Sequence, residues 1–399
     1  MSDHPVTRRR LLTGGAVVLG GTTLGGLAVA ASRQQPADAA ETPWGAETIA
    51  FRGEHQPGIE TPVPAHAWFV ALDLVPDADR EALGRLLALW TDDIERLMSG
   101  RAPLADQERE LAGVPARLTV TVGVGATLFA RLGLDAHRPP SLRPLPPLTG
   151  DRLDPRWGEA DLLLQVGADD VLAVAHAVRV LTRDVRSIAT VRWTQRGFAR
   201  ARGSVATSTT PRNLLGQVDG TVNPVPGSDD FARVVWSRTG PAWWHGGAML
   251  VVRRIRMDLD RWEQLGRTDR ELVVGRRLAD GSPLTGGLEH DPVDLEQVDA
   301  AGLPVVPVAA HVRVARARSE QERFLRRGFS YDDTAERPGD AGLIFCAVMA
   351  DVEAQFLPVQ RRIAAGDLLS SWVTPVGSAV VALLPGARPG ERLAAGLPV

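Results

Sequence analysis

Three segments of this chain carry side chains that could do chemistry together. Asp219 lies in a Gly-x-x-Asp-Gly-Thr motif and offers a carboxylate that could accept a proton and return it. His311 follows an apolar run and offers an imidazole that could bind a metal ion. Arg326 is a fixed cation that could stabilise negative charge as it develops in a reaction. Because the three lie far apart in the sequence, only a fold can bring them together.

Each of these groups also has an ordinary structural interpretation. An Asp-Gly pair is a strong turn signal, a single histidine is more often structural than a metal ligand, and an arginine pair such as 326–327 commonly lies in solvent. The functional interpretation is that Gly220 lets the backbone of the Asp219 loop approach a flat ligand closely. A neutral imidazole at His311 suits haem iron, and Arg313 beside it suits a haem propionate.

Alternating and helical patterns predict two successive sets of strands and helices. The expected strands cover residues 67–74, 117–122, 161–167, 188–198, 248–257, 343–349 and 377–384. The expected helices cover residues 77–98, 126–132, 170–183 and 352–365, with one more beginning at Leu259. Asp77 or Asp79 can cap the first helix. The repetition predicts an α+β fold of two lobes, 41–215 and 216–399, each an antiparallel sheet covered by helices.

Composition excludes several classes of protein. An apolar content of 44% and a charged content of 23% are those of an ordinary globular protein that can bury a sizeable core. A net charge of -3 gives no reason to expect a nucleic acid or a membrane surface as partner. Cys346 is the single cysteine, so an internal disulfide framework is excluded, and its apolar surroundings predict a buried, inert thiol.

The N-terminus has the pattern of an export signal. Arg8 and Arg9 precede an apolar, glycine-rich run over residues 11–30, which resembles a Tat signal. About 20 apolar residues could also span a bilayer, but the six glycines in this run favour a removable signal. Small residues at 28–30 or 37–39 suit a signal peptidase. We expect residues 1–40 to be a Tat signal peptide and linker, and the mature chain to be extracellular, periplasmic or at the cell envelope, without stable membrane insertion.

At these segments the chain resembles the dye-decolorizing peroxidase family, in its bacterial, Tat-exported form. The resemblance spans essentially the whole mature region. The matching segments are 53–59, which resembles the family's Glu-His-Gln-x-Gly-Ile signature, 216–220 with its Gly-x-x-Asp-Gly motif, 311–331 with its haem-ligand segment and distal arginine, and the C-terminal stretches 360–362 and 374–378. Each match is modest alone, but the ordered set is specific.

The resemblance implies two ferredoxin-like lobes, arranged like a dimeric α+β barrel, with haem b held mainly by the C-terminal lobe. It implies that Asp219 is the distal acid and base, that Arg326 is the distal cation, and that His311 is the axial ligand of the haem iron. It also implies that Leu343 and Phe345 form walls of the distal pocket. Among the two adjacent arginines, Arg326 is preferred because its spacing from His311 resembles that of the family.

The implied function is a peroxidase that reduces hydrogen peroxide and oxidises dyes or other bulky aromatic donors. We expect an acid pH optimum, because a carboxylate is a weaker base than an imidazole. Since bulky donors cannot reach buried iron, Tyr331 and Trp262 are candidates for electron transfer at the surface, with plain packing as the alternative.

Two other functions stay open from the sequence. One is an exported haem-processing protein tied to iron uptake, similar to a deferrochelatase, and the other is a haem-binding module with little turnover. Asp219 and Arg326 argue against pure binding, because a storage protein needs neither. The sequence does not decide the physiological reductant or whether the chain forms an oligomer.

Overall fold

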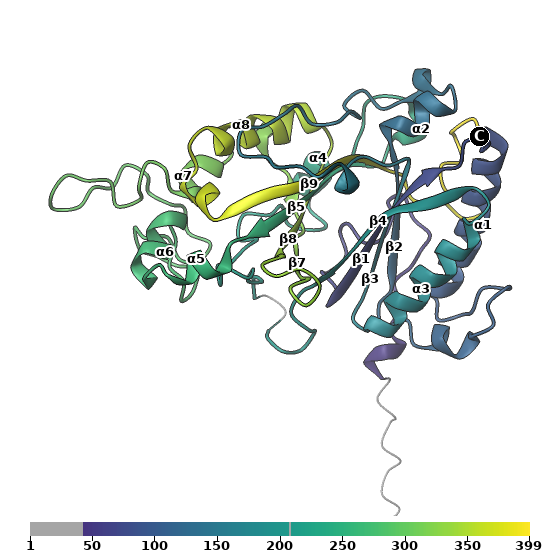
Figure 1. Cartoon of the computed structure of the whole chain (residues 1–399), viewed down its shortest axis with the longest axis horizontal. Coiled ribbons are helices and arrows are strands. Elements are labelled where there is room, and N and C mark those ends of the chain that lie inside the picture. Colours follow the sequence, from purple (N-terminus) through teal and green to yellow (C-terminus); the bar gives the residue numbers. More distant parts are fainter. Residues whose placement is uncertain (1–42, 207–208) are drawn as a thin grey trace, which may run out of the picture. The chain divides into compact units, whose positions relative to one another are not determined.

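The structure is a computed structural model that describes residues 43–206 and 209–399. The expected signal peptide and linker, residues 1–40, lie outside the described residues. Among those that are described, no helix combines the length and apolar character needed to cross a bilayer. The described residues belong to one compact unit, in which one large sheet is flanked by helices (Figure 1).

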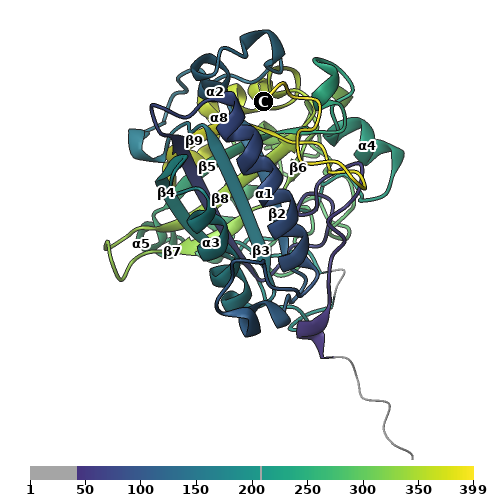
Figure 2. The same ribbon diagram turned by 90° about the vertical axis from the view of Figure 1, so that its right-hand side faces the viewer.

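The N-terminal half builds a four-stranded antiparallel sheet with two long helices on one face. Its elements are β1 (His66–Leu74), α1 (Arg80–Met98), β2 (Thr119–Gly125), α2 (Ala126–Arg131), β3 (Leu162–Ala168), α3 (Val171–Asp184) and β4 (Ala189–Phe198). The strands lie in the order β2-β3-β1-β4, and α1 and α3 run across them (Figure 2). This order, with a helix after the first and third strands, is the ferredoxin-like arrangement.

The C-terminal half repeats the same strand order. Its elements are α4 (Asp229–Val235), β5 (Ala248–Met257), α5 (Leu259–Glu263), α6 (Arg267–Val274), α7 (His311–Ala315), β6 (Leu325–Arg326), β7 (Phe329–Asp332), β8 (Ala341–Met349), α8 (Leu357–Gly366) and β9 (Val373–Leu383). The order β7-β8-β5-β9 matches that of the first half strand for strand, and β6 extends the edge of β8. The expected α+β class with two ferredoxin-like lobes is confirmed. The lobe boundary near residue 215 stays a prediction.

The two halves join edge to edge and close the sheet into a barrel. β2 pairs with β9 at one seam, and β4 pairs with β7 through Phe198 and Ser330 at the other. Because β5 also pairs with β8, the strands form a continuous ring. Its interior is packed with apolar side chains from both halves, such as Phe69, Leu250 and Ile344. Cys346 is buried in the same cluster, and burial raises the pKa of its thiol to about 12.

A glutamine from the N-terminal signature fastens the first seam. The buried side chain of Gln56 donates to the carbonyl oxygens of Val122 and Leu384, both at 2.8 Å, and accepts from the N–H of Val122 at 2.9 Å. Val122 lies on β2, and Leu384 follows β9. The segment that resembles the family signature therefore holds the two halves together, by satisfying backbone groups where the strand pairing ends.

Local rules explain the long helices well. The carboxylate of Asp79 accepts from the N–H of Ala82 and caps α1, as one of the two expected caps. One face of α1 is buried against the sheet, including Leu83, Leu87 and Trp90. The expected helix 352–365 begins instead with a π-helical turn, Val352–Phe356, before α8. Pro358 in the first turn of α8 has no N–H to donate to the preceding turn, which is a physical reason for the wider turn.

Candidate active site

The fold brings Asp219 and Arg326 together. Asp219 lies in the loop between β4 and α4, and Arg326 lies on β6. Nη1 of Arg326 is 3.5 Å from Oδ1 of Asp219, and each side chain is 29% exposed. The arrangement places a proton-accepting carboxylate beside a permanent cation, with both still reachable by a small molecule.

Hydrogen bonds within its own loop hold the Asp219 carboxylate in place. The backbone N–H of Asp219 donates to the carbonyl oxygen of Pro211 at 2.8 Å, and Nδ2 of Asn213 donates to Oδ2 of Asp219 at 3.3 Å. Oδ1 of Asn213 accepts from the N–H of Leu215 at 3.0 Å, so Asn213 is itself fixed. Gly220 has a φ of +131°, a conformation that favours glycine and turns the chain directly after Asp219.

The adjacent arginines of the 326–327 pair have different surroundings. Arg327 is buried and donates to the carbonyl oxygens of Ile59, Thr61 and Pro62. Burial lowers the pKa of Arg327 to about 10. Arg327 therefore ties the N-terminal segment to the sheet, whereas Arg326 is the one that contacts Asp219.

His311 begins α7 and is held by a buried carboxylate. Nδ1 of His311 lies 2.5 Å from Oδ2 of Asp367, whose side chain is 1% exposed while that of His311 is 32% exposed. A neutral ring that donates from Nδ1 to this carboxylate carries its free lone pair on Nε2. A carboxylate behind the ring also fixes its orientation and strengthens it as a metal ligand. Asp367 carries no local sequence signal that pairs it with a histidine 56 residues away.

Comparison with known proteins identifies the family over most of the chain. Residues 56–199 match the N-terminal region of Dyp-type peroxidases, and residues 210–388 match the C-terminal region. The chain belongs to the Dyp-type peroxidase family. It is a haem peroxidase, and its substrates are hydrogen peroxide and a reductant.

Individual relatives cover most of the chain. A dye-decolorizing peroxidase of Thermobifida fusca is 41% identical over 355 residues, which are 85% of this chain and 82% of the relative. A deferrochelatase of Escherichia coli is 34% identical over 412 residues, covering 97% of this chain and 95% of the relative. The crystal structure of a DyP-type peroxidase from Cellulomonas bogoriensis is similar with a TM-score of 0.86 and 50% identity, covering 89% of this chain and 99% of that one. A ferric Streptomyces lividans protein is similar with a TM-score of 0.85, 43% identity and coverage of 89% and 98%.

Haem is the cofactor of this peroxidase, and the residues around His311 fit it. Nη2 of Arg313 donates to the carbonyl oxygens of Leu295 and Val306 at 2.6 and 2.9 Å, and its buried Nε finds no hydrogen-bond partner within the described part of the chain. An acceptor from the cofactor would relieve the cost of that unpaired donor. α7 is largely apolar, yet none of its five residues is fully buried. Apolar surface is therefore left beside His311 for a flat ring to cover.

Leu343, Phe345 and Arg326 share one face of the sheet. Leu343 and Phe345 are two residues apart on β8, so their side chains point the same way. Arg326 pairs with Ala347 of β8, and paired residues of antiparallel strands point to the same face. Leu343 and Phe345 therefore lie on the same face of the sheet as Arg326.

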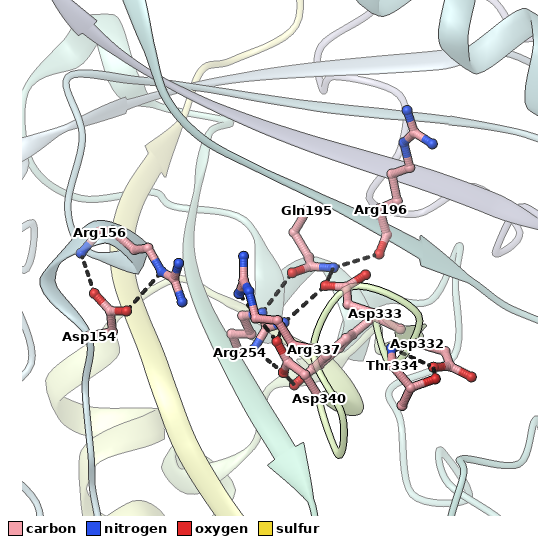
Figure 3. Close-up of polar contacts among 11 residues, drawn as sticks. Asp154, Arg156, Gln195, Arg196, Arg254, Asp332, Asp333, Thr334, Arg337 and Asp340 are labelled. Carbon is pink, nitrogen blue, oxygen red and sulfur yellow. Dashed lines mark hydrogen bonds and ion pairs between the residues drawn. The ribbon is translucent and has the colours of Figure 1, made fainter.

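The expectation that Tyr331 lies at the surface is wrong. Its side chain is fully buried, and its hydroxyl donates to Asp340 at 3.4 Å. The guanidinium of Arg254 lies over its ring, 4.1 Å from the centroid. The same guanidinium donates to Asp340, Asp333 and Gln195 (Figure 3). Burial is the main cause that raises the pKa of Tyr331. β7 turns this residue into the barrel interior, where it cannot touch a bulky donor.

Trp262 is also buried, so it is no surface outlet either. Its Nε1 donates to the carbonyl oxygen of Leu215 at 3.0 Å, and its ring lies 5.5 Å from that of Trp372. Leu215 belongs to the loop that carries Asp219, so Trp262 fastens α5 to that loop. An apolar cluster covers each of the two aromatic residues, so both pack in the interior, and a role in electron transfer stays a prediction.

Proposed function

We propose that His311 would hold the haem iron through Nε2, and that Asp219 and Arg326 would act on hydrogen peroxide. The observation that carries this proposal is the 3.5 Å contact between Asp219 and Arg326 on a fold where His311 presents a free Nε2. Bound haem supplies an iron that takes oxidising equivalents from peroxide and passes them to the reductant. The chain supplies the proton transfer, the charge stabilisation and the ligand.

Asp219 and Arg326 have separate tasks in this proposal. Asp219 accepts a proton from one oxygen of peroxide and returns it to the oxygen that leaves as water. Arg326 stays charged and stabilises the negative charge that develops while the O–O bond breaks. Asn213 holds Oδ2 of Asp219, so Oδ1 faces Arg326.

Four further residues would hold or enclose the cofactor. Arg313 would direct its unpaired Nε at a propionate. Leu343 and Phe345 would form an apolar wall that limits water on the peroxide side. Gly220, which lacks a side chain, would let the Asp219 loop approach the ring closely.

Asp219→Asn is expected to lower kcat/KM for peroxide by about 10²–10⁴-fold, because the amide can neither accept nor return the proton. A carboxylate is a weaker base than an imidazole, so it favours proton transfer under more acidic conditions. The wild-type protein should therefore be most active in acid, and the variant should lose this dependence. Steady-state rates with an anthraquinone dye, measured between pH 3 and 8, check both expectations.

The matched control is Asp260→Asn, because Asp260 is an exposed aspartate on α5. It should keep both the wild-type rate and the wild-type pH profile. A wild-type optimum above pH 7, or equal rates for Asp219→Asn and Asp260→Asn, would remove Asp219 from its proposed role.

The similarity to the dye-decolorizing peroxidase of T. fusca supports dyes and other bulky aromatic molecules as reductants for this chain. The E. coli relative raises a second candidate function, the release of iron from haem with the porphyrin left intact. The contact between Asp219 and Arg326 favours the peroxidase, because releasing iron needs no cleavage of an O–O bond. Incubation with haem followed by porphyrin extraction separates the two functions: iron-free porphyrin without dye bleaching would favour the second.

We also propose that the Tat pathway exports the folded, haem-loaded protein. The support is the twin-arginine pattern at residues 8–9 ahead of an apolar run. Changing both arginines to lysine is expected to retain the protein in the cytoplasm. Equal amounts of the variant and the wild type outside the cytoplasm would contradict this route.

A further inference from the structure

The side chain of Asn223 joins the loop that carries Asp219 to the strand that carries Arg326. Nδ2 of Asn223 donates to the carbonyl oxygen of Arg326 at 2.8 Å, and Oδ1 of Asn223 accepts from the N–H of Arg326 at 2.9 Å. A single carboxamide therefore satisfies both backbone polar groups of Arg326, across 103 residues of sequence.

These backbone groups need a partner because β6 is an edge strand. β6 pairs with β8 on one side, and the next backbone N–H, that of Arg327, also donates toward β8, to Cys346 at 2.8 Å. The order of the strands in the described sheet ends at β6. The N–H and C=O of Arg326 point away from β8, where Asn223 takes the place of a neighbouring strand.

The position of Asn223 is coupled tightly to that of Asp219. The N–H of Asn223 donates to the carbonyl oxygen of Gly220 at 3.2 Å, so a turn begins one residue after Asp219. At Gly220 an added Cβ would lie 3.4 Å from Cγ2 of Thr210 and 3.7 Å from Nδ2 of Asn223, on a backbone that already favours glycine. Only three residues separate Asp219 from Asn223 in the sequence, and a hydrogen bond closes the turn between them.

The ion pair alone is poorly suited to hold this geometry. Asp219 and Arg326 approach to 3.5 Å, and both side chains are 29% exposed. Solvent screens such a pair, and long side chains lose entropy when they are held, so exposed pairs contribute little to structure. The two bonds from Asn223 act on the backbone, where neither protonation nor screening of the side chains weakens them.

We propose that Asn223 is a positioning residue for the peroxide reaction, which sets the spacing between Asp219 and Arg326 through the backbone. This inference rests on the proposed roles of those two residues. Asn223 does not act on peroxide itself, and its effect passes through Arg326.

Asn223→Ala is expected to lower kcat/KM for peroxide by about 10–100-fold, because small displacements of a catalytic group have costs of that order. Haem content and Tm should stay close to the wild-type values, and KM for the dye at saturating peroxide should not change. The affinity of the ferric protein for fluoride, read from its absorption spectrum, should fall as well, because a displaced guanidinium stabilises a bound anion less. Val222→Ala is the matched control, because Val222 is exposed in the same loop, and this variant should leave all five quantities unchanged.

A double-mutant cycle tests whether Asn223 acts through Arg326. In an Arg326→Leu background, adding Asn223→Ala should change kcat/KM by less than about twofold, because the group that Asn223 positions is gone. Losses that multiply in the double variant, or an unchanged rate for Asn223→Ala, would overturn the proposal.

A second variant decides the matter if Asn223→Ala loses haem. Asn223→Asp keeps the acceptor for the N–H of Arg326 and removes the donor to its carbonyl oxygen, so a smaller loss of kcat/KM is expected. An unchanged kcat/KM for Asn223→Asp would also overturn the proposal. If Arg326→Leu and Asp219→Asn are themselves fully active, the proposed function fails. The rates of these single variants show that failure independently of the effect of Asn223→Ala.

Discussion

Arg326→Leu is expected to lower kcat/KM for hydrogen peroxide by about 10²–10³-fold while the purified protein keeps its full haem content. Leucine is apolar, shorter, and has no charge and no N–H donors, so the negative charge on peroxide would develop without a nearby cation. Arg326 is partly exposed, and within the described residues its guanidinium forms an ion pair with Asp219 alone. Its loss should therefore change the free energy of unfolding little. Stopped-flow mixing with peroxide and the Soret absorbance per protein measure the two quantities.

The neighbouring arginine provides an internal contrast to this prediction. Arg327→Leu would leave the carbonyl oxygens of Ile59, Thr61 and Pro62 without their buried donor, so it should lower the free energy of unfolding. Arg238→Leu, at an exposed arginine, should leave both stability and activity unchanged. If Arg326→Leu reacts with peroxide at the wild-type rate, Arg326 is not the distal cation.

His311→Ala is expected to weaken haem binding by more than the 10–100-fold that loss of an outer hydrogen-bond partner typically costs. Alanine removes the only nitrogen that the proposal offers to the iron, and activity should fall with the haem content. The haem-to-protein ratio and the rate of haem transfer to an excess of a haem scavenger measure the effect. Added imidazole should restore part of the wild-type absorption spectrum, because it can occupy the place of the missing side chain.

Two companion variants locate the effect at this histidine. Asp367→Asn keeps His311 but replaces its carboxylate acceptor with an amide, so it should fall between the wild type and His311→Ala. His290→Ala changes an exposed histidine in the same lobe and should bind haem normally. Full haem content and an unaltered spectrum in His311→Ala would show that another group binds the iron.

Much of the fold was predictable because it follows short-range rules. The strand expected at residues 248–257 is β5, with the same bounds as in the structure, and Asp79 caps α1 as one of the two predicted caps. The short elements β6 and β7 were missed, because two to four residues carry no periodicity to detect. Their strand character comes from pairing with β8, which no local pattern reports.

The residue types of the candidate site could be predicted from the sequence, but the contacts that hold those residues could not. The motif around Asp219 and the segment from His311 to Arg326 pointed to proton transfer, metal binding and a fixed cation. The residues that hold them, Asp367 and Asn223, gave no comparable signal, because each acts on a partner more than 50 residues away in the sequence. The expected exposure of Tyr331 failed for a related reason, since a strand residue faces core or solvent according to what packs on its sheet.

The sequence by itself determined the family resemblance, the two α+β repeats and the chemical groups available, because these depend on residue identity and on neighbours along the chain. Only the tertiary structure decided that Arg326 faces Asp219 while Arg327 is buried against residues 59–62. The physical reason is the pleat of the sheet: adjacent residues point to opposite faces, and the pairing of β6 with β8 selects which arginine reaches the carboxylate.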